Sequence, residues 1–173
     1  MCIRDRKRRE EILEHLLIMK NPVKGNEFSD IFNVSRQVIV QDIAVLRAEG
    51  NSIIATPQGY MISNIDIIGY VEQIVCKHHT KEEIIEELNI IVDNGGEILD
   101  VSVEHPIYGE FTGNLMIKSR LDVKNFIHQM EESKAEPMSS LNEGIHLHRI
   151  KTSSKDILEE IKMQLKSKGY LIS

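Results

Sequence analysis

The sequence predicts an α+β chain composed of two domains. Its 173 residues are enough for two small domains, and an apolar fraction of 41% is ordinary for globular proteins. Helical periodicity of apolar residues dominates the first third of the chain, whereas strand-like and helical segments alternate through the remainder. We therefore expect a first domain over residues 7–63 and a second domain over residues 65–173, with a boundary at Asn64–Asp66.

Hydropathy and cysteine content predict the cellular setting. No run of about 18 apolar residues occurs, so we expect no membrane-spanning segment. The N-terminus is charged from Arg4 onward and lacks the apolar region of a secretory signal, and Cys2 and Cys76 are too few for a disulfide framework. These features predict a cytoplasmic protein. Met1–Arg6 fits neither the helix that follows nor any motif, so we exclude it from the predicted fold.

The net charge of −6 is unevenly distributed along the chain. Residues 1–64 carry nine Lys or Arg and eight Asp or Glu, a net charge of +1, whereas residues 65–173 carry twelve and nineteen, a net charge of −7. A protein that reads DNA needs a local basic face rather than an overall positive charge. The first domain is therefore compatible with DNA binding, although its charge alone does not establish that function.

Three helices followed by two strands are predicted in the first domain. Their expected positions are Lys7–Met19, Asn26–Phe32, Arg36–Glu49, Ile53–Ala55 and Tyr60–Ile62. Pro22 ends the first helix, Ser35 caps the start of the third, and Gly50 ends it. A helix, a short helix, a tight turn, a third helix and a two-stranded ribbon follow one another in a winged helix-turn-helix, which is the predicted fold of this domain.

The third predicted helix has an apolar face and a polar face. Ile39, Ile43 and Leu46 recur at helical spacing and are expected in the core. The start of the helix and its opposite face carry amide, arginine, hydroxyl and small apolar groups, which can contact base edges or phosphates. The candidate DNA-contacting residues are Ser35, Arg36, Gln37, Val40, Gln41 and Arg47. The alternative is the solvent-exposed face of an unrelated three-helix bundle.

The second domain is predicted to follow the order β-α-β-β-α-β-α-β. The segments, in chain order, are Tyr70–Lys77, Thr80–Asp93, Ile98–Glu104, Gly109–Ser119, Val123–Ser133, Gly144–Lys151, Ser153–Lys168 and Tyr170–Ile172. Thr80 and Ser153 are expected to begin capping boxes in front of two of the helices. This order predicts one mixed sheet with helices packed on it, a sandwich-like arrangement related to the ferredoxin-like plan.

Three histidines and a glutamate are candidates for a metal site in the second domain. His146 and His148 alternate on a predicted strand, so their side chains point to the same face. His79 follows a strand and Glu87 lies two turns into the next helix, a corner that can bring both to one site. Imidazole and carboxylate ligands suit zinc, nickel, iron or manganese. Spacing alone leaves His78 as an alternative to His79, and the strand pair could be an exposed polar face.

Both domains resemble the nicotinate-responsive transcription repressors, whose second half is a three-histidine (3H) domain. In the first domain the similarity covers Val34–Gly50 and continues through the predicted ribbon. In the second domain it extends over the full length. The matching segments there are Cys76–His79, Glu86–Leu88, Ile91–Gly96, Asp100–Val101, Val103–Glu110 and Gly144–His148.

The resemblance implies a DNA-binding repressor of NAD biosynthesis or niacin uptake genes, and not an enzyme. Nicotinate is the implied co-repressor, and two recognition helices on a double-stranded DNA operator require a homodimer. The implied metal ligands are His79, Glu87, His146 and His148. The family places its first histidine eight residues before the glutamate that precedes a leucine, which selects His79 over His78.

Two further residues are candidates for contacts with the effector. Arg149 could donate hydrogen bonds to a carboxylate, and His105 matches a family histidine that precedes a proline at a strand turn. His105 fits an orienting role beside the site and, equally, a purely structural role. Cys76 is expected to be a small buried strand residue rather than a metal ligand.

Two other functions are compatible with the same residues. The metal itself could be the signal, which would make the protein a zinc- or nickel-responsive regulator. A metal with open coordination positions could also activate water in an enzyme. No obvious base, nucleophile or phosphate-binding glycine loop accompanies the candidate ligands, so the sequence favours a regulator over a metalloenzyme.

Overall fold

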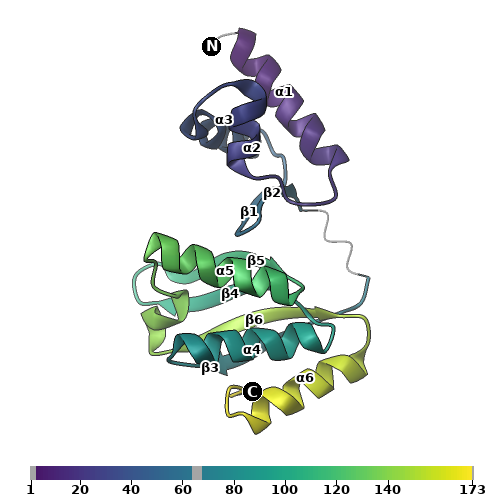
Figure 1. Ribbon diagram of the computed structural model, residues 1–173, viewed down its shortest axis with the longest axis vertical. Helices are drawn as coiled ribbons and strands as arrows, with labels where there is room; N and C mark the ends of the chain where they lie inside the picture. The colour runs from purple at the N-terminus through teal and green to yellow at the C-terminus, as the bar shows by residue number, and fades with distance from the viewer. Residues whose placement is uncertain (1–2, 64–67, 173) are drawn as a thin grey trace. The chain divides into compact units, whose positions relative to one another are not determined.

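A computed structural model of the chain describes residues 3–63 and 68–172. The chain forms two compact units, Met1–Ile65 and Asp66–Ser173, and the predicted boundary at Asn64–Asp66 lies outside the described residues. The predicted α+β class is confirmed, because helices with a small ribbon are followed by a sheet with helices packed on it (Figure 1). None of the helices in the described ranges combines the length and apolarity needed to cross a membrane.

The first unit has the element order expected for a winged helix-turn-helix. Its elements are α1 (Ile3–Ile18), α2 (Gly25–Phe32), α3 (Arg36–Ala48), β1 (Ile53–Thr56) and β2 (Gly59–Ile62). Strands β1 and β2 pair antiparallel. A single core contains buried residues from α1, α2, α3 and β1. Strand β2 contributes only the partly buried Tyr60 and Ile62, which pack against that core. The buried core residues are Ile12, Leu16, Val23, Phe28, Ile39, Ile43, Leu46 and Ile53.

Helix α1 begins at Ile3, so the exclusion of Met1–Arg6 from the predicted fold was wrong for the described part of that segment. The Asp5 carboxylate accepts a hydrogen bond from Arg8 at 3.1 Å, and the Arg6 guanidinium donates to Glu10 at the same distance. Such pairs three and four residues apart stabilise a helix without any apolar residue. Hydrophobic periodicity therefore missed the first turn of α1.

A buried charge cluster fixes α3 against α1. The Asp42 carboxylate is buried, accepts a hydrogen bond from Arg8 Nε at 2.6 Å, and lies 3.6 Å from Arg9 Nη1. The hydrogen bond to Asp42 raises the pKa of Arg8. Breaking such a buried pair would leave an uncompensated charge, which is strongly unfavourable. Arg8 and Arg9 thus hold α3 against α1, and their positive charges are paired with Asp42 within the first unit.

The second unit is a four-stranded sheet with its helices packed on one core. Its elements are β3 (Tyr70–Lys77), α4 (Lys81–Asp93), β4 (Glu97–His105), β5 (Gly109–Ile117), α5 (Arg120–Ser133), the 3₁₀ helix η1 (Met138–Asn142), β6 (Ile145–Thr152) and α6 (Lys155–Ser167). Helices α4 and α5 lie side by side over one face of the sheet (Figure 1). Core residues from the sheet and helices include Ile74, Leu88, Ile91, Ile98, Ile117, Ile150, Ile161 and Leu165.

The sheet is wholly antiparallel, so the prediction of a mixed sheet was wrong. The strand order is β3-β6-β4-β5, and every neighbouring pair runs antiparallel. Helix α4 joins β3 to β4 and α5 joins β5 to β6, and each helix links strands that run in the same direction. One strand lies between the members of each such pair, so no parallel neighbours form. The central strands are the second and fourth, unlike the ferredoxin-like plan with its first and third at the centre.

Two predicted details at the end of the chain also differ from the structure. The residue that caps α6 is Ser154, whose side chain accepts a hydrogen bond from the Ile157 N–H, and not Ser153. The predicted strand at Tyr170–Ile172 is an isolated bridge to β3 through Leu171 and Cys76, without a regular ladder.

The helix η1 was not predicted, because its five residues carry no helical periodicity.

Gly144 lies where the chain enters β6 and approaches the backbone that follows β3. Its φ angle is +86°, and a Cβ atom added there would lie 2.1 Å from the His78 carbonyl oxygen. The His78 N–H donates a hydrogen bond to the Gly144 carbonyl at 3.3 Å. Any side chain at position 144 would therefore force the end of β3 and the start of β6 apart.

We expect Gly144→Ala to lower the free energy of unfolding more than Gly95→Ala does. Both glycines have positive φ angles, +86° and +83°, so both substitutions carry the conformational cost of a left-handed residue, about 1–2 kcal/mol. Only the alanine at 144 would also meet backbone, because nothing lies within 4 Å of a Cβ at Gly95. Chemical denaturation of the full chain measures both losses, and equal losses would contradict this account of the β3–β6 approach.

Candidate metal centre

His146 and His148 lie on the face of β6 that the helices cover. Both side chains are buried, as are Ile74 and Cys76 opposite them on β3. Arg149 follows His148 in the strand and points to the other face, because successive strand residues alternate. The predicted same-face placement of the two histidines is therefore confirmed, and the alternative of an exposed polar face is excluded.

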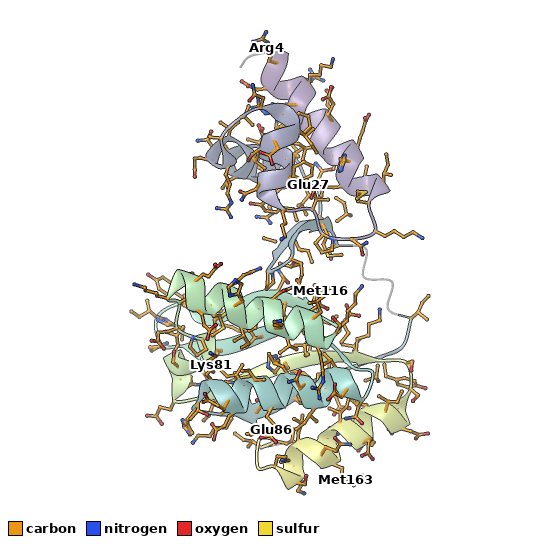
Figure 2. All side chains as sticks on the ribbon, viewed as in Figure 1. Arg4, Glu27, Lys81, Glu86, Met116 and Met163 are labelled. Atoms are coloured by element: carbon orange, nitrogen blue, oxygen red, sulfur yellow. The ribbon has the colours of Figure 1, made fainter. Side chains whose placement is uncertain are left out.

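Helix α4 directs Glu87 toward β6. Glu87 shares the inner face of the helix with the buried residues Ile84, Leu88 and Ile91. The neighbouring residue Glu86, labelled in Figure 2, instead accepts hydrogen bonds from Tyr170 and Lys168. One step along the helix thus separates a carboxylate at the rim of the unit from a carboxylate in its core.

The start of α4 is fixed by the predicted capping box at Thr80. The Thr80 hydroxyl accepts from the Glu83 N–H at 3.2 Å, and the Glu83 carboxylate accepts from the N–H groups of Thr80 and His79. These backbone hydrogen bonds lower the pKa of Glu83. The capping box sets the register of α4, and with it the direction in which Glu87 points.

Glu87 is the centre of a buried polar cluster. Its side chain is 0% exposed, and its Oε1 lies 3.1 Å from His146 Nε2 and 3.2 Å from His148 Nε2. Its Oε2 has no hydrogen-bond partner among the described residues and lies 3.7 Å from His78 Nε2. A buried carboxylate oxygen without a partner is unfavourable by about 1–3 kcal/mol or more. The donor set is therefore incomplete without a further group.

The second ring nitrogen of each strand histidine faces a backbone carbonyl. His146 Nδ1 lies 2.9 Å from the Gly144 oxygen, and His148 Nδ1 lies 2.8 Å from the Asp100 oxygen. If each neutral ring donates its Nδ1–H to the carbonyl, its Nε2 carries a lone pair and no proton. That lone pair then faces the negative Glu87 carboxylate, and the two groups repel each other. Either the rings carry a second proton or a cation lies between Nε2 and the carboxylate. Metal-binding histidines in proteins show this same carbonyl contact.

The electrostatic environment favours an ionised Glu87. Burial alone would raise the pKa of Glu87, but the hydrogen bonds and charges of His146 and His148 outweigh burial and hold that pKa well below its usual range. Burial opposes a proton on His148, yet its hydrogen bond to Glu87 raises the pKa of this histidine overall. For His78 burial dominates and lowers the pKa to about 4. An ionised carboxylate and a neutral imidazole are the forms that bind metals.

Of the two tandem histidines, His78 points toward the cluster and His79 does not. The His78 side chain is 7% exposed, and its ring centroid lies 4.3 Å from that of His146. His79 is exposed, and among the described residues no contact joins its side chain to Glu87. The structure thus brings together three of the four predicted ligands. It adds His78, which spacing had left as an alternative, while His79 stays a prediction.

The two candidate effector contacts lie apart from this cluster. Arg149 pairs with Asp100 through its Nε at 2.6 Å on the opposite face of β6. His105 ends β4, accepts hydrogen bonds through Nδ1 from two N–H groups of the following turn, and stacks on Tyr108 with a centroid distance of 5.1 Å. These contacts favour structural roles for both residues, which was one of the two expectations for His105.

Cys76 is buried on β3, as predicted, and the structure adds that it lies beside the cluster. A ligand atom from each of Cys76, Glu87 and His146 lies within 4.8 Å of the others. Burial, together with the negative charge of Glu87, raises the pKa of the Cys76 thiol. Alternation along β3 could have identified this neighbourhood, because Cys76 faces His146 across the strand pair.

The predicted DNA-contacting residues lie on the outer side of α3. All of them are exposed except Val40, which is half-buried. The Ser35 hydroxyl accepts from the Val38 N–H at 3.4 Å, which confirms the predicted cap. Arg47 Nε donates to the Ile53 carbonyl at 2.7 Å and ties the end of α3 to β1. Ser35 and Arg47 therefore have structural contacts in addition to any contact with DNA.

Known proteins match both units of the chain. A helix-turn-helix (HTH) domain family matches residues 8–61, and the 3H domain family matches residues 72–173. The chain is similar to a probable transcription repressor NiaR of Thermotoga maritima, with 44% identity over 165 residues, 95% of this chain and 93% of that protein. It is also similar to the transcription repressor NadR of Bacillus subtilis, with 37% identity over 167 residues and the same coverage. The chain therefore belongs to the family of helix-turn-helix transcription repressors that carry a 3H domain.

Proposed function

We propose that this DNA-binding repressor controls genes of NAD biosynthesis or niacin uptake, with nicotinate as a co-repressor that binds at a metal in the second unit. The observation that carries the proposal is the buried cluster of Glu87, His146 and His148. In it, two imidazole nitrogens and a carboxylate with one unpartnered oxygen meet within hydrogen-bond distance. The names of both relatives as transcription repressors support regulation over catalysis, and among the described residues the cluster brings together no catalytic group besides the candidate ligands.

The donor set fits a divalent transition metal. Two neutral imidazoles and one carboxylate are common ligands of zinc, nickel, iron and manganese. Each strand histidine is oriented by a backbone carbonyl, as expected for a ligand. The bound metal would satisfy the free oxygen of Glu87 and leave coordination positions open for a further donor. These residues would thereby link α4 to β6.

A fourth ligand is proposed from the tandem histidines. His78 is favoured by its buried side chain and its 3.7 Å distance from Glu87 Oε2. His79 is favoured by the spacing of the family, and its ring lies beside Gly144 at the start of β6. The two residues are adjacent and their side chains point to opposite sides of the chain, His78 inward and His79 outward, so only one of them can belong to the centre in a given backbone conformation.

We expect one of the variants His78→Ala and His79→Ala to lose more than about 100-fold in zinc affinity, because altering the groups that merely orient a ligand already costs 10–100-fold. The other variant should remain within about 3-fold of the wild type. Competition with a chromophoric chelator measures both affinities, and His128→Ala on the exposed side of α5 is the control. Wild-type affinity in both variants would show that the fourth ligand does not come from this pair.

A cavity of about 410 Å³ beside His79 can hold the effector. Ligand sites in proteins usually have about 300–1,000 Å³. The cavity is lined by His79 and Ile84, by the cationic side chains of Lys81 and Lys134, and by the carboxylates of Glu131 and Glu136. Lys81 also pairs with Glu131. The pyridine nitrogen of nicotinate resembles an imidazole nitrogen as a donor and could bind an open coordination position of the metal. The nicotinate carboxylate could then pair with one of these lysines, the role that the sequence had suggested for Arg149.

The decisive experiment is a thermal shift of the metal-loaded chain with nicotinate, nicotinamide, quinolinate or no ligand, each with and without a chelator. A ligand at a hundred times its Kd stabilises the folded state by about 2.7 kcal/mol. Nicotinate should raise the melting temperature only when metal is present, and His146→Ala should abolish the rise. A nicotinate effect that survives chelation or the His146 substitution would refute binding at the metal. A large effect of metal without any pyridine effect would instead favour the metal-responsive regulator.

The first unit is proposed to read its operator as a homodimer through the outer face of α3. Recognition helices of such dimers enter major grooves about 34–36 Å apart. The amide groups of Gln37 and Gln41 can pair with adenine, and the Arg36 guanidinium can pair with guanine or phosphate. All three side chains are exposed.

We expect Gln37→Ala and Gln41→Ala each to weaken operator binding by about 1–3 kcal/mol, the usual contribution of a bidentate contact between a side chain and a base. Gln73→Ala is the matched control, because Gln73 is an exposed glutamine on β3 of the second unit. Fluorescence anisotropy with the upstream region of a niacin gene measures the loss. Unchanged affinity in both variants would place the base contacts elsewhere.

A further inference from the structure

We propose that the turn between β4 and β5 docks into the groove between α4 and α5 of a second copy of the chain, so that two copies join reciprocally through their second units. This inference rests on the proposed homodimer and names the surface that holds it together. The protruding element is the apolar tip, which consists of Ile107, Tyr108 and Phe111. Neither the predicted recognition helix nor the candidate metal centre involves these residues.

The apolar tip is exposed and fixed in shape. Ile107 is 79% exposed and Tyr108 is 71% exposed. The Nδ1 atom of His105 accepts hydrogen bonds from the N–H groups of both residues, at 3.2 and 3.3 Å. The Phe111 ring centroid lies 5.0 Å from that of His105 and 5.6 Å from that of Tyr108. A turn that is already held in one conformation loses little further freedom when it binds a partner.

The composition of the apolar tip indicates a contact surface. Single exposed apolar side chains are normal on a protein, but an exposed apolar patch marks an interaction site. Aromatic residues are also enriched at protein interfaces relative to the remaining surface. Here Tyr108 and Phe111 contact each other, and Ile107 precedes Tyr108 in the same turn. The three side chains therefore form one patch that a partner can cover.

The groove between α4 and α5 can receive this tip. Its volume is about 460 Å³, and its apolar lining comes from Ile85, Val123 and Ile127. The two helices that form it lie side by side (Figure 1). Pockets of about 300–1,000 Å³ hold drug-sized ligands, so the groove has room for the side chains of Ile107 and Tyr108.

Two exposed carboxylates flank the apolar tip. Glu104 and Glu110 lie directly opposite each other in the β4–β5 register. Like charges in this position destabilise the pairing of two strands. Glu104 forms no ion pair with another residue of the described ranges 3–63 and 68–172. A cation from a partner would relieve this repulsion.

The groove supplies the opposite charge. Lys124 lines it, is exposed, and pairs with no carboxylate in the part of the chain that the structure describes. Arg120 and His128 also line the groove, and each lies beside a carboxylate of its own unit. The one acidic residue of the lining, Glu131, is already paired with Lys81. Lys124 is therefore the cation that suits Glu104 of a second copy.

A second copy of the chain is the occupant that these two surfaces favour. Tip and groove are complementary in apolar character and in charge, and both belong to the second unit. In a dimer with two-fold symmetry each contact forms twice, because the tip of each copy meets the groove of the other. Two-fold symmetry is also what a pair of operator half-sites requires.

Sedimentation equilibrium of the full chain measures the Kd of the dimer. We expect Ile107→Ser and Tyr108→Ser each to raise this Kd at least about 30-fold, the effect of losing an anchor residue at the centre of an interface. Met163→Ser is the matched control and should leave the Kd unchanged. Met163, labelled in Figure 2, is 60% exposed on α6 and lies in neither surface.

A charge exchange tests the pairing of tip with groove. Glu104→Lys and Lys124→Glu should each raise the Kd about 3-fold or more at low ionic strength, since each replaces an attraction by a repulsion at the rim of the interface. The two substitutions combined in one chain should restore the wild-type Kd. A variant that fails to fold cannot produce this restoration, so the result reports on the interface itself.

The outcomes separate this inference from the homodimer on which it rests. A wild-type dimer whose Kd is unchanged in both tip variants would overturn the inference alone and leave the tip for a different partner. Weakening by both charge variants without restoration in the combined chain would refute the pairing of Glu104 with Lys124 across the interface. A wild-type chain that stays monomeric at every concentration, with and without metal, would refute the homodimer as well.

Discussion

The buried carboxylate of Glu87 is the constraint on which the second unit depends. A carboxylate in the core is tolerated only with compensating donors or a cation, and the donors come from His146 and His148 on a different element. The position of α4 over the sheet, the register of β6 and the orientation of both imidazoles must therefore agree. Gly144 belongs to the same constraint, because its carbonyl orients His146 and its missing side chain admits the backbone of His78.

Local patterns predicted the elements well, and long-range pairing accounts for most of what they missed. The periodicity of apolar residues placed every regular helix and strand of the described chain within a few residues, and the Thr80 capping box formed as expected. The strand order was not predictable in this way. Insertion of β6 between β3 and β4 depends on which edges pair after the helices have packed, and no residue of β6 alone specifies it. The early start of α1 rests on ion pairs of Asp5 and Arg6, which carry no hydropathy signal.

The candidate site shows the same division between local and tertiary information. Strand alternation correctly placed His146 and His148 on one buried face. Applied to β3, the same alternation runs through Ile74, Cys76 and His78, all of which are buried. The spacing of the family selected His79 instead, and in the structure the backbone of that residue turns away to donate to Glu83 in the cap of α4. Strand alternation favours His78 and family spacing favours His79 as the ligand. The two criteria disagree because β3 stops just before this pair, and the two-residue alternation of a strand does not continue into a helix cap.

A metal centre that joins α4 and β6 would allow a small effector to change the relative stability of different arrangements of the second unit. Any donor that completes the coordination shell stabilises the arrangement in which these elements meet and favours it over alternatives. An effector changes DNA affinity only by the difference in its affinity for the competing arrangements of the recognition helices. That coupling is reciprocal, so operator DNA must change effector affinity by the same factor. A ligand set of fixed geometry suits the coupling of effector binding to DNA affinity, because a coordination shell is either complete or incomplete. The two conditions of the shell would correspond to two discrete states of the protein.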